Sequence, residues 1–204
     1  QGIDTEDKMI RLGKALFQEL NIEKEKYSMA VGNALEYLEN VEEGNFDTVL
    51  CLGMLYYTTE PYRLLNLMLR AAKETVILDT FTAAYAAIQG KDAPQVYKNV
   101  TEETLKLPIL LTALTQSEKK DYTLPHSFDY RSKDLSLITL PSIKLLEIWF
   151  QSLNTEFTKL DWSTYKTRSC TYHDLLTPQQ KKSSHWADVY TSDIRVSYLL
   201  HKQK

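Results

Sequence analysis

The sequence predicts an α/β protein with a parallel, doubly wound sheet. In the first 81 residues, the strand-like runs "YSMAV", "FDTVLCL" and "ETVILDTF" alternate with helical segments. The last two runs are apolar over most of their length, as strands of a parallel sheet are when helices cover both faces. Strands that alternate with helices along the chain are typical of this architecture. The chain itself opens on "QGID", which reads as the end of a further strand.

The first helix is predicted between Glu6 and Leu20. Its apolar residues recur at intervals of three and four, namely Met9, Leu12, Leu16 and Leu20. Glu6 and Asp7 fall in the first turn, where the helix dipole stabilises negative charge. We therefore expect an amphipathic helix of about four turns.

The following segments continue the alternation. After a polar connector at 21–26 and the strand "YSMAV", the stretch "NALEYLENV" predicts a short helical turn. A buried strand at 48–52 runs into Gly53. Pro61 then opens the leucine-rich helix "YRLLNLMLRAA", because proline is tolerated in a first turn. "ETVILDTF" follows this helix as another buried strand.

The regular alternation stops at residue 82 and returns at residue 140. The intervening segment contains Pro94, Pro108 and Pro125 and mixed helical pieces, so we expect a largely helical insertion that caps the strand ends. From residue 140 on, "LPSIKLLEIWFQSLNTEFTKLDW" predicts a helix followed by a strand, and "DIRVSYLLHKQ" predicts a final strand. The predicted organisation is one sheet domain, made of 1–81 and 140–204, with 82–139 inserted into it.

Composition excludes several classes of protein. With 43% hydrophobic and 25% charged residues, the 204-residue chain can bury a core and reads as a soluble globular protein. No apolar run reaches the roughly 18 residues of a spanning helix, and no signal peptide precedes the first element, so we expect a cytoplasmic protein without membrane contact. A net charge of −3 does not favour nucleic-acid binding through overall charge. Cys51 and Cys170 form no disulfide framework and the four histidines are scattered, so no metal site is expected.

Polar and aromatic residues follow the ends of three predicted strands, where ligands bind in such sheets. Asp4 can accept the hydroxyls of a ribose or serve as a helix N-cap, and the spacing favours neither. "NALEYL" can meet a flat base or form a surface turn. In "CLGMLYYTTEP", Gly53 permits close backbone approach and Tyr56 and Tyr57 offer hydroxyls and ring faces. Tyrosines after a buried strand are nevertheless more often core residues.

These stretches together resemble the class I S-adenosylmethionine-dependent methyltransferases, and among them the bacterial enzymes that carboxymethylate 5-hydroxyuridine at the wobble position of tRNA. That family has a "GxLYH" stretch with a proline four residues later, a "PS" that opens a helix with "LxxWL", a "T-x-x-x-Q-R/K-x-x-x-W" loop and a closing "RAxLIA" strand. The matching stretches here are Gly53 to Tyr57 with Pro61, Pro141-Ser142 with Trp149, Thr177 to Lys181 with Trp186, and Arg195 to Leu200. The resemblance spans nearly the whole chain except 82–139.

The resemblance implies a cofactor site built by 1–81 and completed by 140–204. The residues that would hold the ribose, line the adenine and pack against the cofactor are, in that order, Asp4 with Thr5 and Glu6, Leu35 with Glu36, and Leu52. Tyr56 and Arg195 would bind the extra carboxylate of carboxy-S-adenosylmethionine, which an arginine can hold bidentately. Without the family, Arg195 reads more simply as a strand-edge charge that faces solvent.

The family also implies a final antiparallel strand and a first strand with a glycine-rich turn, which would lie upstream of Gln1. Two departures are visible, because Tyr57 stands where the family has His and no "EGYPAP" stretch precedes Arg195. The implied reaction is an in-line displacement, in which an oxygen of the substrate attacks the carbon on the sulfonium. The enzyme contributes mainly positioning and electrostatics, and no side chain is assigned a catalytic role.

The implied partner is tRNA, whose phosphates would meet a basic surface. The candidate residues for it are Lys119, Lys120, Arg131, Arg168, Lys181 and Lys182, which can equally form an ordinary solvated face. One alternative is methylation of a small molecule under the 82–139 cap with plain S-adenosylmethionine. Another is a non-catalytic, methyltransferase-like binding module. An NAD-dependent oxidoreductase fits less well, because the chain has no G-x-G-x-x-G. The sequence predicts no oligomeric state.

Overall fold

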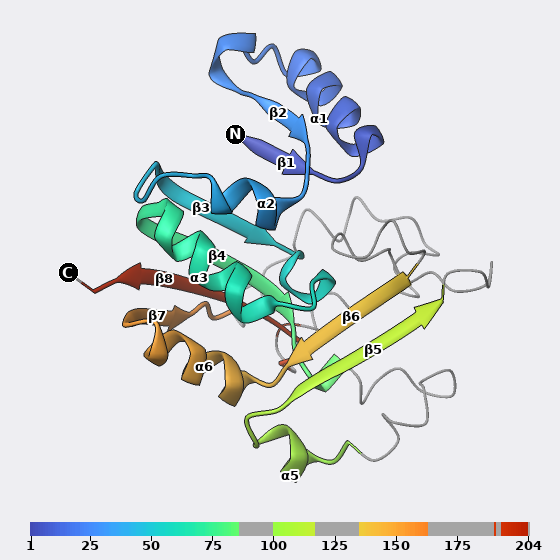
Figure 1. Cartoon of the computed structure of the whole chain (residues 1–204), viewed down its shortest axis with the longest axis vertical. Helices are drawn as coiled ribbons and strands as arrows, with labels where there is room; N and C mark the ends of the chain where they lie inside the picture. The colour runs from blue at the N-terminus through green and yellow to red at the C-terminus, as the bar shows by residue number, and fades with distance from the viewer. Residues whose placement is uncertain (86–99, 117–134, 163–189, 191–192, 204) are drawn as a thin grey trace.

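The computed structural model of the chain describes residues 1–85, 100–116, 135–162, 190 and 193–203, which form three sheets and several helices (Figure 1). The strands are β1 (Gly2–Asp4), β2 (Met29–Val31), β3 (Phe46–Leu52), β4 (Ala72–Phe81), β5 (Leu110–Gln116), β6 (Leu135–Pro141), β7 (Thr155–Lys159) and β8 (Arg195–Lys202). The main helices are α1 (Asp7–Glu19), α2 (Ala34–Glu39), α3 (Pro61–Ala71), α5 (Glu102–Leu105) and α6 (Ile143–Ser152). Short 3-10 turns lie at Lys24–Lys26 and Leu55–Tyr57.

The largest sheet contains four strands in the order β3-β4-β8-β7. β3 and β4 are parallel, whereas β8 is antiparallel to both of its neighbours, β4 and β7. The predicted antiparallel final strand is therefore confirmed. The remaining described strands form a parallel pair, β1-β2, and an antiparallel pair, β5-β6.

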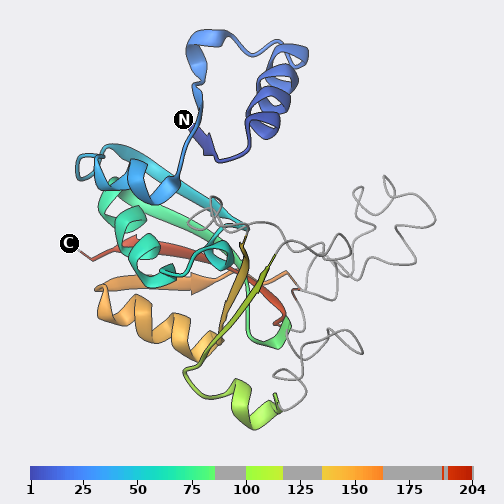
Figure 2. The ribbon, with the colours of Figure 1, turned by 45° about the vertical axis from the view of Figure 1, so that its right-hand side comes forward.

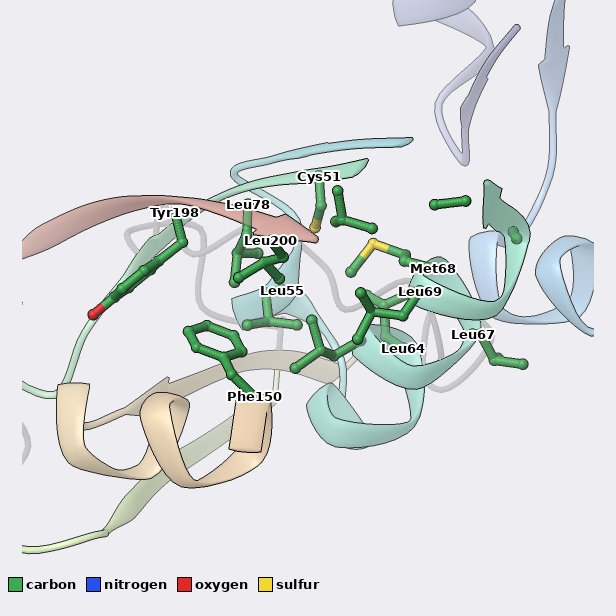
Figure 3. Packing of buried hydrophobic residues seen from close by; sticks show 14 of the residues in the cluster. Cys51, Leu55, Leu64, Leu67, Met68, Leu69, Leu78, Phe150, Tyr198 and Leu200 are labelled. Atoms are coloured by element: carbon green, nitrogen blue, oxygen red, sulfur yellow. The ribbon is translucent and has the colours of Figure 1, made fainter. Parts of the chain in front are cut away.

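Helices α3 and α6 supply the core beneath the four-stranded sheet (Figure 3). Leu64 and Leu65 of α3 and Phe150 of α6 are at most 1% exposed. The Phe150 ring lies 5.0 Å from that of Tyr198 on β8. Burying such side chains stabilises a fold by about 1.5–3 kcal/mol each, so this cluster fixes the positions of β4 and β8.

The starts of these two helices follow from their sequences. Pro61 is the first residue of α3, where its fixed φ suits the helix and its missing N–H is not needed. Ser142 is the N-cap of α6, and its side chain accepts a hydrogen bond from the Leu145 N–H at 3.2 Å. Both helices were predicted, and both are confirmed.

The β1-α1-β2 unit extends away from the four-stranded sheet, as Figure 2 shows. The predicted helix is present as α1, but the four apolar residues that predicted it, Met9, Leu12, Leu16 and Leu20, are 52–60% exposed. Within this helix, Ile10 is the buried residue. An apolar cavity of about 290 Å³ lies between β1 and β3, lined among others by Ile3, Leu38, Leu50 and Met68. A further strand upstream of Gln1 stays a prediction.

The described part of the insertion differs from the expected helical cap. It contains the one-turn helix α5 and the hairpin strands β5 and β6, so it is mainly extended. The segments "LLTALTQ" and "LSLITLP" are short apolar runs with threonines, which periodicity alone cannot assign to helix or strand. Their threonines and isoleucine favour strands. β6 also continues to Pro141, past the expected boundary at 139, and the division into domains stays a prediction.

No helix within the described ranges is both long enough and apolar enough to cross a membrane.

Candidate functional site

The candidate site lies where β3 and β4 end. Gly53 follows β3 directly and has a φ of 73°, a left-handed conformation that favours glycine. Its N–H donates a hydrogen bond to the Asp79 carbonyl oxygen at 2.9 Å, which ties the end of β3 to β4. The side chain of Leu52, predicted to pack against a cofactor, is 57% exposed at this end.

A buried ion pair joins the end of β4 to the start of β8. Asp79 and Arg195 side chains are 9% and 13% exposed, and the Arg195 Nε donates to Asp79 Oδ1 at 2.6 Å. The Arg195 Nη2 also contacts Asp79 Oδ1. The other carboxylate oxygen, Oδ2, accepts hydrogen bonds from Ser197 Oγ at 2.7 Å and from the Tyr190 hydroxyl at 2.9 Å. Asp79 therefore has hydrogen-bond partners at both oxygens.

The strand register explains why these residues meet. Asp79 on β4 is opposite Ser197 on β8, and Phe81 is opposite Arg195. Residues two apart on a strand share a face, so Arg195 is the diagonal neighbour of Asp79 on the same side of the sheet. The ion pair is thus held by two hydrogen-bonded strands.

Burial and the charge of Asp79 shift the pKa values of Arg195 and Tyr190. Burial lowers the pKa of Arg195, but the hydrogen bond from Arg195 to Asp79 and the charge of Asp79 raise it, and the net pKa is above the ordinary value. Burial, followed by the charge of Asp79, raises the pKa of Tyr190 to about 12. Arg195 is therefore cationic and Tyr190 neutral at physiological pH.

Tyr56 and Arg195 come together beside Gly53. A methyl group on Gly53 would lie 3.1 Å from the Tyr56 hydroxyl and 3.3 Å from Arg195 Nη2. Tyr56 is 5% exposed, and burial is the main cause that raises the pKa of its hydroxyl. The family resemblance paired Tyr56 with Arg195, and the structure brings them together. Whether they bind a carboxylate stays a prediction.

Aromatic rings surround this point. The Tyr56 ring lies 4.3 Å from that of Tyr57 and 5.1 Å from that of Phe81, which in turn lies 4.5 Å from Tyr85. The Arg195 guanidinium carbon lies 4.9 Å from the centre of the Phe81 ring. The buried residues Ile138 and Leu140 of β6 belong to the same hydrophobic cluster as Tyr56. One strand of the insertion therefore packs against the aromatic wall of the site.

The other predicted residues lie at the ends of β1 and β2. Asp4 Oδ1 accepts a hydrogen bond from the Glu6 N–H at 2.7 Å. The N-cap of α1 is Glu6, so the interpretation of Asp4 as the N-cap is wrong by two residues. Thr5, next to Asp4, is half-buried.

Leu35 and Glu36 lie in the first turn of α2, where the Asn33 side chain accepts a hydrogen bond from the Leu35 N–H at 2.9 Å. The Leu35 side chain is 5% exposed and belongs to the main core, whereas Glu36 is exposed. A ligand that meets this turn would therefore meet its backbone and Glu36 rather than the Leu35 side chain.

Sequence reasoning missed Asp79. The interpretation of Arg195 as a solvent-facing charge is also wrong, because its side chain is 13% exposed and paired. A signal existed in "VILDTF", where one acidic residue interrupts an apolar strand. A buried carboxylate needs a partner, and Arg195 at the start of the final strand was the available cation.

The basic residues proposed for tRNA, the Thr177 to Trp186 motif and Cys170 lie outside the described residues. Among the residues that the structure does describe, no group of three or more His, Cys, Asp or Glu side chains could hold a metal ion.

The parallel pairs β1-β2 and β3-β4, the helices that connect their strands and the antiparallel β8 form a Rossmann-like fold, which is also the fold of S-adenosylmethionine-dependent methyltransferases. The chain is similar to an S-adenosylmethionine-dependent methyltransferase from Mesorhizobium loti, with a TM-score of 0.53 and 12% identity over 98% of this chain and 79% of that one. The YcgJ protein from Bacillus subtilis gives a TM-score of 0.53 and 10% identity over 100% of this chain and 82% of that one.

A further similar structure is the N-terminal domain of EvdMO1 with S-adenosylhomocysteine bound, at a TM-score of 0.52 and 12% identity. The alignment covers all of this chain and 64% of that one, so the chain spans less than two thirds of that structure. No protein-family model and no curated protein sequence matches the chain. The similarity therefore confirms the fold that the sequence predicted.

Proposed function

We propose that the chain is the core of an S-adenosylmethionine-dependent methyltransferase. The observation that carries the proposal is the end of β3, where left-handed Gly53 and exposed Leu52 lie beside Tyr56 and the Arg195–Asp79 pair. In open α/β sheets, ligands bind outside the carboxyl ends of strands. The likeness in fold to a domain that binds S-adenosylhomocysteine supports the same choice of ligand class.

In this proposal the cofactor lies across the ends of β1, β2 and β3. Asp4 would accept hydrogen bonds from the ribose, with Thr5 and Glu6 beside it. The turn at Leu35 and Glu36 would meet the adenine, and Leu52 would cover the middle of the cofactor with its exposed side chain. The ring of Tyr57, which is half-buried, suits the sulfonium, because aromatic faces attract cations.

Methyl transfer requires little direct chemical participation by the side chains. Methyl transfer from a sulfonium is an in-line displacement, so the protein contributes chiefly by holding the two reacting atoms in line and by its electrostatic field. Since the Arg195 charge is already compensated by Asp79, the pair adds no net charge next to a cationic cofactor. Plain S-adenosylmethionine therefore suits the site.

Calorimetric titration tests this function. The wild-type protein should bind S-adenosylmethionine and S-adenosylhomocysteine, with NAD as a ligand that should not bind. Asp4→Asn should weaken binding by roughly tenfold or more, the usual worth of a charged hydrogen bond. Asparagine keeps an oxygen that can accept from the Glu6 N–H, so the local turn should survive.

The matched control is Asp7→Asn. Asp7 lies in the first turn of the same helix and pairs with Arg11 at the surface, at 3.1 Å. Like Asp4→Asn, the Asp7→Asn substitution removes one negative charge near the start of α1. It should leave the affinity for both cofactors within about twofold, since exposed ion pairs contribute little. A folded wild-type protein that binds neither cofactor would favour the non-catalytic binding module instead.

A second candidate is carboxymethyl transfer from carboxy-S-adenosylmethionine to wobble 5-hydroxyuridine of tRNA. The proximity of Tyr56 and Arg195 at Gly53 favours it. The double variant Asp79→Ala/Arg195→Leu, which leaves neither charge unpaired, should then weaken binding of the carboxylated cofactor by about 1.5–3 kcal/mol and leave plain S-adenosylmethionine nearly unchanged. Binding of tRNA should also decline steeply as salt rises. A flat salt response would favour a small-molecule substrate.

A further inference from the structure

Asp79 already holds the part of Arg195 that a ligand at Gly53 would approach. Arg195 Nη2 is the guanidinium nitrogen 3.3 Å from the position of a methyl on Gly53, and the same nitrogen pairs with Asp79 Oδ1. The Nε donates to the same oxygen at 2.6 Å. A ligand carboxylate beside Gly53 would approach the same nitrogen, Nη2, that already pairs with Asp79.

Asp79 is itself held in place. Its Oδ2 is bound by Ser197 and Tyr190, and its backbone oxygen accepts from the Gly53 N–H. Asp79 lies within β4, which pairs with β3 on one side and with β8 on the other. Its carboxylate cannot swing away to make room for a second anion without losing the hydrogen bonds from Ser197 and Tyr190.

A second negative charge at Gly53 would also lie next to the first. Two like charges a few ångströms apart in a partly buried site repel strongly, because little water screens them. The Asp79–Arg195 pair thus compensates the guanidinium charge internally and disfavours an anionic ligand group at the same point.

We propose that Asp79 is a positioning residue that orients Arg195 and, as its internal counter-ion, makes the site select a cofactor without an extra carboxylate. This rests on the proposed function, because the selectivity concerns the group carried by the sulfonium. The Asp79 carboxylate and the extra carboxylate of a cofactor would thus compete for the charge of the Arg195 guanidinium.

The first experiment tests, without any cofactor, whether Asp79 is the counter-ion of Arg195. Asp79→Ala removes the carboxylate and leaves space for a small anion, so sodium formate should raise the melting temperature more than sodium chloride does at equal ionic strength. Wild type should show no formate-specific rise. The double variant Asp79→Ala/Arg195→Met should show none either, because it has no guanidinium to pair, and replacing a buried ion pair with apolar groups is often tolerated.

The second experiment tests the selectivity of the site between the plain and the carboxylated cofactor. The affinities for S-adenosylmethionine and carboxy-S-adenosylmethionine are measured by calorimetry for wild type and for Asp79→Asn, which keeps the shape of the side chain. Wild type should prefer the plain cofactor, and Asp79→Asn should shift the ratio by at least tenfold toward the carboxylated one. The control Asp193→Asn removes a charge two residues before Arg195, from a side chain that pairs with Lys159, and should leave the ratio unchanged.

Absence of formate rescue in Asp79→Ala, or equal rescue in the double variant, would overturn the counter-ion role. Rescue with an unchanged cofactor ratio in Asp79→Asn would overturn the selectivity. If wild type binds neither cofactor, the proposed function fails together with the selectivity, and the formate experiment still decides the pairing of Asp79 with Arg195 independently.

Discussion

Helices α1 and α3 have similar amphipathic sequences but different surroundings. In α3, seven residues are buried, among them Leu64, Leu65 and Met68, which pack into the core of the four-stranded sheet. In α1, Leu12 and Leu16 are more than half exposed although they recur with the same helical period. Periodicity therefore predicts which residues share a face of a helix, and the rest of the fold determines whether that face is covered.

Strand β3 lies between these two regions. One edge pairs with β4 along six register positions, and Cys51 is buried in the main core. Its alternate residues Leu50 and Leu52 are 59% and 57% exposed. Leu50 and Leu52 share the face of β3 opposite to Cys51, because side chains alternate along a strand. The candidate site is thus at the boundary between the packed and the open region.

The largest expected effect is on stability and compares the same substitution in the two helices. Leu65→Ala in α3 should lower the free energy of unfolding by about 2–5 kcal/mol, because the residue is fully buried. Leu16→Ala in α1 should lower it by less than about 1 kcal/mol, since exposed substitutions have small effects. Urea denaturation of both variants checks this. Equal losses would mean that α1 is covered in solution.

A second pair of variants separates backbone strain from crowding at the site. Gly53→Ala and Gly44→Ala each place a side chain at positive φ, 73° and 65°, which should cost about 1–2 kcal/mol in both. Only the methyl at Gly53 would press on Tyr56 and Arg195, whereas that at Gly44 would meet Lys73 at an ordinary 3.9 Å.

Calorimetry on the same two glycine variants should show loss of S-adenosylhomocysteine binding in Gly53→Ala and near-normal affinity in Gly44→Ala. The reverse order, or equal affinities, would move the ligand away from the end of β3.

The N-caps of α6 and α2 offer a smaller test, because one cap is buried and bonded to a second segment and the other is not. Ser142 is 2% exposed and, besides capping α6, donates to the Leu107 carbonyl at 2.6 Å. Ser142→Ala should therefore cost about 1–2 kcal/mol, at the upper end for a cap. Asn33→Ala, which removes the cap of the six-residue helix α2, should cost less. Thermal melts of the two variants compare them, and a larger loss at Asn33 would contradict the expected order.

The smallest expected effect is a pH dependence at Tyr190. Its pKa is raised from 10 to about 12, so the stabilisation from the neutral hydroxyl is complete below pH 10 and declines as pH rises toward 12. Tyr190→Phe should be less stable than wild type by about 1 kcal/mol at pH 8 through the lost hydrogen bond to Asp79. The difference should narrow between pH 10 and 12. A constant difference across this range would show that the Tyr190 hydroxyl does not titrate with folding.

Much of the fold could be predicted because its elements have strong local signals. Pro61 and Ser142 mark helix starts, and the apolar runs of β3 and β4 mark strands. The hairpin β5-β6 was missed, because short apolar runs with threonine fit a helix or a strand until a partner strand is known.

The site was predicted only in part. Tyr56 and Arg195 were paired through a family resemblance, and the structure places both beside Gly53. Asp79 could not be assigned to Arg195 from spacing, because the two residues are 116 positions apart in the chain and meet only through the β4-β8 register. Because Asp79 already neutralises Arg195, the guanidinium does not need a carboxylated cofactor as its counter-ion.

Hydrogen exchange with and without S-adenosylhomocysteine tests most directly whether the cofactor binds across the ends of β1 and β3. Slower exchange is expected in the presence of the ligand at residues 4–6 and 53–57, with no change in the surface turn at 42–45. Unchanged exchange at 53–57 under saturating S-adenosylhomocysteine would contradict the assignment of the site.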